Sequence, residues 1–368
     1  MQVSDKKELS SVQQLAIEHI SQYARTRKHE AHKSIKEVLQ MSNISWNTFE
    51  DAVAKLMSNA RVALHFHPDR PIADMKCVAQ SLLEQGIYKS QFETHISNGS
   101  VSAYPGGVRD LWEKKMFGGV YQLDGVTNNQ RPKYGALHLL LHPDGPAPRF
   151  GSCYFLLSPK VSYRCTYTYL DSHQDPKERG TYDEFDDIVS ATFKDAFIQE
   201  YAIGEKDLTP RKLIDNLLYK LERPFKDFSK CKPSRNLNHY IEAQVHGDIT
   251  LKDDVEVLVA DPSFKGTYIG ECFEKMCLKY SIELYWHMGF ALRVEEIPKD
   301  FRGPTMPSLA KRIARNDYID ASVIGAAAND LKRNPAQWSD RGDYEKVLQE
   351  LKYMWHVLVR YGNAFARE

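Results

Sequence analysis

The sequence lacks an excess of charge of either sign: 49 lysines and arginines stand against 49 aspartates and glutamates in 368 residues. A balanced charge argues against a general nucleic-acid binder and against a protein that adheres to acidic membranes. The sequence also lacks an apolar run near the roughly 18 residues that span a bilayer. Its N-terminal segment, "MQVSDKKELSSVQQLAIEHI", has no apolar core of a secretory signal. We therefore expect a soluble cytoplasmic protein with neither nucleic acid nor membrane as a partner.

Cysteine, metal-ligand patterns and phosphate-loop patterns are also scarce. There are six cysteines, and the closest pair, Cys272 and Cys277, has the spacing of neither a zinc knuckle nor a redox CxxC motif. This argues for a reducing compartment. His65, His67 and His246 have no third ligand at a typical spacing, and the glycine pairs at 106–107 and 118–119 fit no GxGxxG or Walker pattern. We expect no metal.

Three zones of different texture follow one another along the chain. Residues 1–60 carry apolar residues at helical spacing, and Ser45 and Asn47 are N-cap candidates for the second helix. Residues 61–297 contain short β-rich runs with helical stretches between them. Residues 298–368 return to helix, most clearly in "DYEKVLQELKYMWHVLVRYG". The pattern predicts an α+β domain between two helical segments. The expected strands are 61–66, 134–141, 151–158, 162–170, 240–247, 255–260, 282–287 and 290–294.

The run "VALHFHPDRP" contains His67-Pro68-Asp69, the tripeptide with which J-domain co-chaperones stimulate Hsp70. A J-domain places this tripeptide between two antiparallel helices, of which the first is basic. "TFEDAVAKLMSNARVAL" and "MKCVAQSLLEQGIY" could imitate those helices, although Asn59 and a lone Arg61 stand where a basic face is expected. A J-domain-like co-chaperone is therefore one alternative.

Two later strands carry polar side chains at alternate positions. "VSYRCTYTYLDS" alternates threonine and tyrosine, and "YIEAQVHG" places an acid and an amide two residues apart. Because residues i and i+2 of a strand face the same side, Thr166 and Thr168 point together, as do Glu242 and Gln244. Paired polar groups on a strand that ends at a Gly turn suggest the wall of a pocket.

The chain resembles a divergent bacterial branch of the ADP-ribosyltransferase superfamily, of the Arg–Ser–Glu type, whose relatives include toxins and translocated effectors. The resemblance rests on "HFHPDR", "YKSQFETHISNG", "RPKYGAL", "RCTYTYLDS" and "YIEAQVHG", which occur in this order over residues 60–295. It implies a split α+β core of two small sheets that meet at an NAD cleft. It also implies helical flanks that recognise the target, and an effector role would mean delivery into a host cell.

The superfamily pattern carries over to three positions of this sequence. Arg70 takes the place of the first-strand arginine that holds the NAD phosphates, and Thr166 replaces the serine that braces the pocket. Glu242 takes the place of the catalytic glutamate. Toxins that modify arginine usually have Glu-x-Glu, whereas here Gln244 occupies the second position. The roles within this pair and the identity of the acceptor stay open.

A competing alignment uses "DVEVLVADP" and makes Asp254 and Glu256 the acidic pair. We rank it second, because "VEVLVA" has the composition of a core strand. Candidates to sandwich the nicotinamide ring are Tyr134, Tyr167 and Phe92. Further residues that the resemblance places at NAD or at its lid are Thr94, Ser97, Asn98 and Gly99, together with His67 next to Arg70.

These residue types suit cleavage of the nicotinamide–ribose bond. The reaction passes through an oxocarbenium-like state, which a carboxylate near the ribose stabilises. A guanidinium binds phosphate oxygens bidentately and keeps its charge. The resemblance thus implies a mono-ADP-ribosyltransferase that uses NAD⁺ as co-substrate, without a metal, and modifies a protein, arginine being the favoured acceptor. The alternatives are an NAD glycohydrolase, a non-catalytic NAD-binding module and the co-chaperone.

Overall fold

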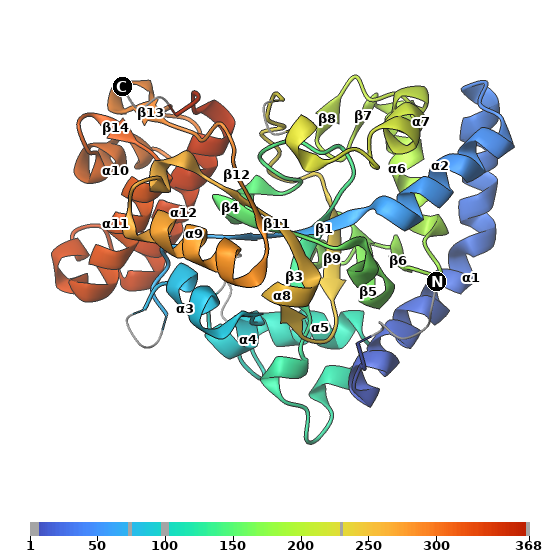
Figure 1. The fold of residues 1–368 in the computed structure, drawn as a ribbon, viewed down its shortest axis with the longest axis horizontal. Helices are drawn as coiled ribbons and strands as arrows, with labels where there is room; N and C mark the ends of the chain where they lie inside the picture. The colour runs from blue at the N-terminus through green and yellow to red at the C-terminus, as the bar shows by residue number, and fades with distance from the viewer. Residues whose placement is uncertain (1–6, 73–75, 97–102, 229–230, 366–368) are drawn as a thin grey trace.

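The computed structural model describes residues 7–72, 76–96, 103–228 and 231–365. At its centre is an eight-stranded sheet (Figure 1). All neighbouring strands in it are antiparallel except β11 and β12, which are parallel. In order across the sheet, the strands are β12 (Glu283–Trp286), β11 (Val255–Ala260), β4 (Cys153–Leu157), β1 (Arg61–Phe66), β3 (Lys133–His138), β9 (Ile241–Val245), β5 (Cys165–Tyr169) and β6 (Arg179–Thr181).

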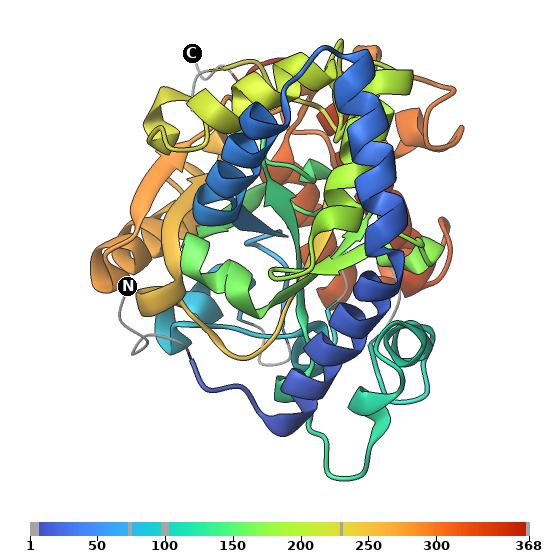
Figure 2. The same ribbon diagram turned by 90° about the vertical axis from the view of Figure 1, so that its right-hand side faces the viewer.

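Helices surround this sheet on several sides. One end is covered by α1 (Ser11–Met41), α2 (Trp46–Asn59), α6 (Asp186–Ile198) and α7 (Pro210–Tyr219), and the opposite end by α10 (Met306–Ile313), α11 (Ala321–Arg333) and α12 (Tyr344–Tyr361) (Figure 1). Figure 2 views the molecule from the side of α1, which runs along the height of the fold. The shorter helices are α3 (Val78–Gln85), α4 (Gln91–Thr94), α5 (Val108–Met116), α8 (Leu251–Asp254) and α9 (Tyr268–Tyr280).

Three small two-stranded sheets complete the described part of the chain. They pair β10 (Ile249–Thr250) with β2 (Ile87–Tyr88), β13 (Leu292–Arg293) with β14 (Tyr318–Ile319), and β7 (Tyr201–Ala202) with β8 (Glu205–Lys206).

The predicted α+β composition is confirmed. Each run expected as a strand contains a strand, and β1 and β11 have the predicted bounds of 61–66 and 255–260. The two N-terminal helices also form, and the Ser45 side chain caps α2 by accepting a hydrogen bond from the Thr48 backbone N–H at 3.1 Å. Alternation dictates the burial: Val62, Leu64 and Phe66 of β1 all enter the main hydrophobic core.

The two central strands of the sheet pair over only part of their length. In β1, Arg61 to Ala63 pair with His138 to Ala136 of β3, and the ladder then ends. Beyond Ala63, β1 continues to pair with β4, while the first residues of β3 pair with β9. The sheet is therefore continuous at one end of β1 and open at the other.

This geometry corrects the expectation of two small sheets that meet at a cleft. The described strands of the core form a single eight-stranded sheet. The physical reason is that β1 pairs with β4 on one side and, over Arg61 to Ala63, with β3 on the other, so that it joins the two halves.

The surroundings of His67-Pro68-Asp69 differ from those in a J-domain. The tripeptide follows the central strand β1 and not a helix, and both His67 and Asp69 are 8% exposed. The His67 ring packs edge-on against Trp355 of α12, with ring centroids 5.6 Å apart. Asp69 lies against Gly325 of α11. A loop that docks onto a partner needs exposed side chains, so this geometry does not support the co-chaperone alternative.

Among the residues that the structure describes, no helix is long and apolar enough to cross a membrane. The same residues contain no group of three or more His, Cys, Asp or Glu side chains that could hold a metal ion.

Candidate functional site

A cavity of about 360 Å³ opens where β1 and β3 separate. Its lining includes His65 and Phe66 from the end of β1 and residues 133–136 of β3. If the β1–β3 ladder continued in register, it would place His65 opposite Tyr134; instead the two strands diverge there. The cavity volume lies within the range of small-molecule sites.

The cavity brings together residues that are far apart in the sequence, including several predicted from the sequence. The predicted residues that line it are Arg70, His67, Thr94, Tyr134 and Glu242. Gln244 and Thr166 are fully buried behind this lining, with no exposed surface. Ser97, Asn98 and Gly99 lie outside the described residues.

Glu242 presents its carboxyl group to the cavity from β9. It is 5% exposed, and burial is the largest effect on its carboxyl group, raising its pKa to about 8. The nearby charge of Asp171 raises the pKa further, whereas the Ser172 hydroxyl, the Gln244 amide and Arg109 act in the opposite direction. The cavity therefore holds a carboxyl group whose pKa lies near neutrality, as the pKa values of acid–base and electrostatic catalysts often do.

The predicted alternation on β5 and β9 is confirmed by side-chain hydrogen bonds. The Gln244 amide donates to Glu242 Oε1 at 2.9 Å, and its carbonyl accepts from Thr166 Oγ1 at 2.8 Å. Thr166 Oγ1 also lies 3.1 Å from His246 Nε2, and Tyr121 Oη lies 2.6 Å from His246 Nδ1. Because the Thr166 proton is used on Gln244, His246 donates through Nε2 and accepts from Tyr121. This series of hydrogen bonds, from Tyr121 through His246 and Thr166 to Gln244, fixes the orientation of the Gln244 amide behind Glu242.

Three arginines line the cavity without a carboxylate partner. The side chains of Arg70 and Arg109 make no hydrogen bond or ion pair with any residue in the described ranges, and Arg149 donates only to the Asn238 amide at 3.0 Å. Arg109 is 7% exposed, and its Nε has no hydrogen-bond partner. Burial lowers the pKa of Arg70. A buried cation without an ion-pair partner is costly, as for Arg109, and with the half-buried Arg70 and Arg149 it forms a cluster that is suited to an anionic ligand.

Aromatic rings support these cations. The Arg109 guanidinium lies 5.0 Å from the centroid of Tyr134 and 5.5 Å from that of Trp112, and Arg149 lies 4.9 Å from that of Phe150. Of the three aromatic candidates, only Tyr134 lines the cavity. Tyr167 packs against Phe185 in the core. Phe92, the third candidate, is buried beneath the Arg131 guanidinium.

Helix α5 supplies one wall of the cavity and was not predicted from the sequence. Arg109 and Trp112 face the cavity, and Glu113, one residue further on, accepts a hydrogen bond from the Tyr134 hydroxyl at 2.9 Å. Arg131 anchors the back of the helix, 2.8 Å from Glu113 and 2.6 Å from Asp110. The i, i+3 spacing of Arg109 and Trp112 was the available signal, but "VRDLWEKKM" has a mixed polar pattern that also fits a surface helix.

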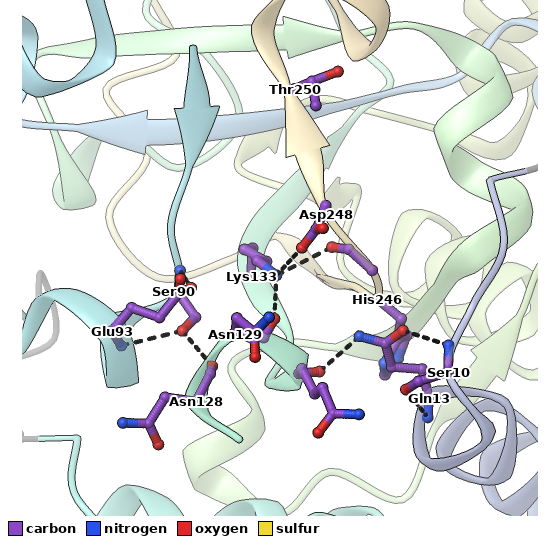
Figure 3. Close-up of polar contacts among 12 residues, drawn as sticks. Ser10, Gln13, Ser90, Glu93, Asn128, Asn129, Lys133, His246, Asp248 and Thr250 are labelled. Carbon is purple, nitrogen blue, oxygen red and sulfur yellow. Dashed lines mark hydrogen bonds and ion pairs between the residues drawn. The ribbon is translucent and has the colours of Figure 1, made fainter. Parts of the chain in front are cut away.

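Lys133 lines the cavity but is already bound by the protein. Its ammonium donates to the carbonyls of Asn129 at 2.8 Å and Gly247 at 3.1 Å, and it lies 3.9 Å from Asp248 (Figure 3). Figure 3 also shows Ser90, whose hydroxyl donates to the Asn128 carbonyl at 2.8 Å. Lys133 therefore stabilises the loop that precedes β3.

A His–Asp pair was also missed. Asp171 and His173 both line the cavity, and the His173 Nδ1 atom lies 2.9 Å from Asp171 Oδ1. The pair follows β5 directly in the sequence "YLDSHQD". Its only sequence signal was the proximity of two polar residues at a strand end, which also fits an ordinary turn.

The competing acidic pair lies elsewhere. Asp254 forms ion pairs with Lys7 at 2.5 Å and with Arg164 at 3.2 Å, and Glu256 pairs with Arg61 at 2.8 Å. Neither residue lines the cavity. Their charges are already compensated, so the geometry favours Glu242 as the acidic residue of the site.

Residues 61–361 match a family described as a protein of unknown function, DUF3626. No curated protein matches the chain. The family match begins at the first residue of β1 and ends at the last residue of α12, and it contains every residue that lines the cavity. Helices α1 and α2 lie outside the match.

Proposed function

The chain belongs to the DUF3626 family, and from its cavity we propose that it is a mono-ADP-ribosyltransferase. It cleaves NAD⁺, releases nicotinamide and transfers ADP-ribose to a protein side chain. The observation that carries this proposal is Glu242, a buried carboxyl group in a cavity whose three arginines have no carboxylate partner.

The cationic wall supports binding of a dinucleotide. A pyrophosphate carries negative charge that suits Arg70, Arg109 and Arg149, which form no ion pair with a described residue, and guanidinium groups bind phosphate oxygens with two parallel hydrogen bonds. Trp112, Tyr134 and Phe150 offer ring faces for flat heterocycles. NAD⁺ combines both features, and the cavity that carries them opens within the single sheet, where β1 and β3 separate.

Glu242 supports the chemistry at the ribose. Loss of nicotinamide leaves positive charge on the ribose, and a carboxylate fixed nearby stabilises that charge; one well-placed group is worth about 10²–10³ in rate. In the empty cavity burial keeps this carboxyl group largely protonated at neutral pH, with a pKa of about 8. The cationic nicotinamide ring favours its ionised form, so NAD⁺ binding itself generates the active state.

Nicotinamide release from NAD⁺ by the purified protein tests this proposal. We expect release by the wild type and a loss of about 10²-fold or more in Glu242→Gln. Glu256→Gln is the matched control, because Glu256 lies on the neighbouring half of the sheet, paired with Arg61, outside the cavity. Equal rates in the wild type and Glu242→Gln would remove Glu242 from the mechanism. Binding of NAD⁺ without any release would identify a non-catalytic NAD-binding module.

Transfer and hydrolysis differ only in the acceptor. An NAD glycohydrolase would release nicotinamide without labelling protein, whereas a transferase would label a protein in a lysate with the ³²P-ADP-ribose moiety. The resemblance to effector-type transferases makes a host-cell lysate the first choice, and arginine the first residue to seek by mass spectrometry. Labelling that is lost in Glu242→Gln but retained in Glu256→Gln would support transfer.

A further inference from the structure

Asp171 and His173 form an oriented pair at the edge of the cavity. Asp171 Oδ1 lies 2.9 Å from His173 Nδ1 and also accepts the His173 backbone N–H at 3.1 Å. The second carboxylate oxygen, Oδ2, accepts the Tyr240 hydroxyl at 2.7 Å. Both oxygens of Asp171 are thus engaged, so the carboxylate cannot rotate away from the imidazole.

The His173 side chain lines the cavity. A carboxylate 2.9 Å from Nδ1 is stabilised by a proton on that nitrogen and repelled by a lone pair, so Asp171 favours the tautomer that leaves a lone pair on Nε2. Nε2 has no hydrogen-bond partner within the described parts of the chain. The ring packs against Trp112 with centroids 5.7 Å apart, and the side chain is 45% exposed. An accessible, oriented imidazole is the usual form of a general base.

The sheet places this pair beside Glu242. Tyr169, the last residue of β5, is registered with Ile241, the residue before Glu242, and the Leu170 N–H donates to the Tyr240 carbonyl at 3.0 Å. Asp171 and His173 therefore leave the sheet next to the start of β9 and line the same cavity as Glu242. Glu242 reaches the cavity from β9, and His173 reaches it from the segment that follows the adjacent strand β5.

We propose that His173 is the general base that removes a proton from the acceptor, and that Asp171 is its positioning residue. This inference rests on the proposed function. The bond between ribose C1′ and the nicotinamide nitrogen breaks, and its electron pair leaves with neutral nicotinamide. A lone pair of the acceptor forms the new bond to C1′. The acceptor's proton passes to His173 Nε2, and the imidazolium, held by Asp171, then releases it to solvent.

The assignment fits the absence of a second glutamate on β9. With Gln244 in the second position, and with its amide hydrogen-bonded to Glu242 and Thr166, that side chain cannot accept a proton from the acceptor. The His–Asp pair supplies a base at the same end of β9, from the neighbouring strand. The acceptor class is therefore a group that loses a proton on transfer.

Chemical rescue tests His173. We measure nicotinamide release from NAD⁺ in a host-cell lysate, which supplies both water and protein acceptors. His173→Ala should lower kcat by about 10²–10⁴-fold while changing the KM for NAD⁺ little. Added imidazole should restore turnover, and substituted imidazoles should restore it more strongly as their basicity rises. Asp171→Asn should also lower kcat, because an amide can stabilise the wrong tautomer, and imidazole should not rescue it.

A second His–Asp pair in this chain provides a matched control. His32 Nε2 lies 2.7 Å from Asp186 Oδ1, with the histidine 40% exposed, on α1 and α6 outside the cavity. His32→Ala should retain the wild-type rate with or without imidazole. Rescue of His173→Ala must leave no ADP-ribosyl-imidazole, because the added base takes up a proton and not the sugar.

The outcomes separate the two proposals. Release that is lost in Glu242→Gln but unchanged in His173→Ala overturns the general base and leaves the proposed function standing. Release that is lost in His173→Ala without imidazole rescue also overturns it, since a structural role would then explain the loss. No release by the wild type overturns the proposed function, and the general base with it.

Discussion

The Gln244 side-chain amide donates a hydrogen bond to the Glu242 carboxyl group at 2.9 Å, while its carbonyl accepts one from Thr166 at 2.8 Å. A glutamine can satisfy both neighbours, because it carries a donor and an acceptor at the same end. A second glutamate could not donate to Glu242 in its ionised form. The Glu-x-Gln order is thus explained by hydrogen bonding on the buried side of the cavity.

Gln244→Glu should destabilise the protein in a pH-dependent way. Two adjacent buried carboxyl groups raise each other's folded-state pKa above the unfolded value, and the cost is present above that value. We expect a loss of about 1–3 kcal/mol in the free energy of unfolding at pH 8. The loss should shrink toward pH 5, where the pair keeps a shared proton. Gln244→Met removes the same hydrogen bonds without adding a charge. Because the Gln244 amide lowers the pKa of Glu242, the loss in Gln244→Met should also grow with pH, but less than the loss in Gln244→Glu.

Glu242→Gln should stabilise the protein at alkaline pH. The folded-state pKa of Glu242 is raised from 4.5 to about 8 by burial. Between these values the folded state keeps a proton that the unfolded state has lost, so stability falls as pH rises through this window. Glutamine does not titrate. Thermal unfolding at pH 5 and pH 8 should show a Tm advantage of the variant that grows with pH. A constant difference between the two proteins would contradict the raised pKa.

Nicotinamide release should increase with pH. The ionised form of Glu242 stabilises the ribose cation, and in the free protein this form becomes dominant only near pH 8. The value of kcat/KM should therefore rise by up to about tenfold per pH unit below that point and then level off, since this parameter reports the free enzyme. Initial rates from pH 6 to pH 9, with the Tm checked at each pH, measure the profile. A flat or falling profile would exclude a carboxylate that must ionise.

Arg109→Gln should weaken NAD⁺ binding with little loss of stability. Its guanidinium has no hydrogen bond or ion pair with a described residue, so the folded protein loses mainly the cation–π contacts with Tyr134 and Trp112. Hydrogen bonds to charged groups contribute about 1.5–3 kcal/mol, which corresponds to an affinity loss of about tenfold or more. Calorimetric titration of NAD⁺ into the Glu242→Gln background avoids turnover. Arg61→Gln is the control: Arg61 pairs with Glu256 outside the cavity and should bind normally.

Gly325→Ala should destabilise the contact between α11 and the loop after β1. A Cβ at this position would lie 1.3 Å from Asp69 Oδ2, which is far inside van der Waals contact. Overpacking of this kind costs about 1–3 kcal/mol or more in the free energy of unfolding. Adding Asp69→Gly to this variant should recover part of the loss, because the clashing carboxylate is gone. Denaturant unfolding of the two single variants and the double variant measures the coupling; additive effects would show that the clash does not arise.

Seven of the eight strands of the sheet were accessible from the sequence because they are short, apolar or alternating, and bounded by turn residues, whereas the three-residue strand β6 was not predicted. "RVALHF" and "VEVLVA" become β1 and β11 with unchanged bounds. The register was not accessible. Nothing in "RVALHF" shows that β1 pairs with β3 for only three residues before the strands separate. The separation arises in the tertiary structure, where β1 continues alongside β4 and β3 alongside β9.

The site was predictable where a residue belonged to a recognisable strand or motif. Glu242, Tyr134 and Arg70 all line the cavity. The residues that were missed, Arg109, Arg149, Asp171 and His173, come from loops and from a helix whose charges read as a solvated surface. A side chain at a loop is directed by the long-range packing of its loop, and single-sequence periodicity carries no information about that packing.

The end of the β1–β3 ladder at Ala63 and Ala136 has a consequence for how the cavity can change in evolution. Past this point, the edges of β1 and β3 that would have faced each other have main-chain donors and acceptors without a strand partner. A ligand that reaches these edges can hydrogen-bond to the main chain as a neighbouring strand would. It is then recognised by backbone atoms, which every amino acid has. Substitutions along these edges can reshape the walls while leaving that part of recognition intact, with proline as the exception. Members of one family could thus diverge in their side chains and still hold the same ligand.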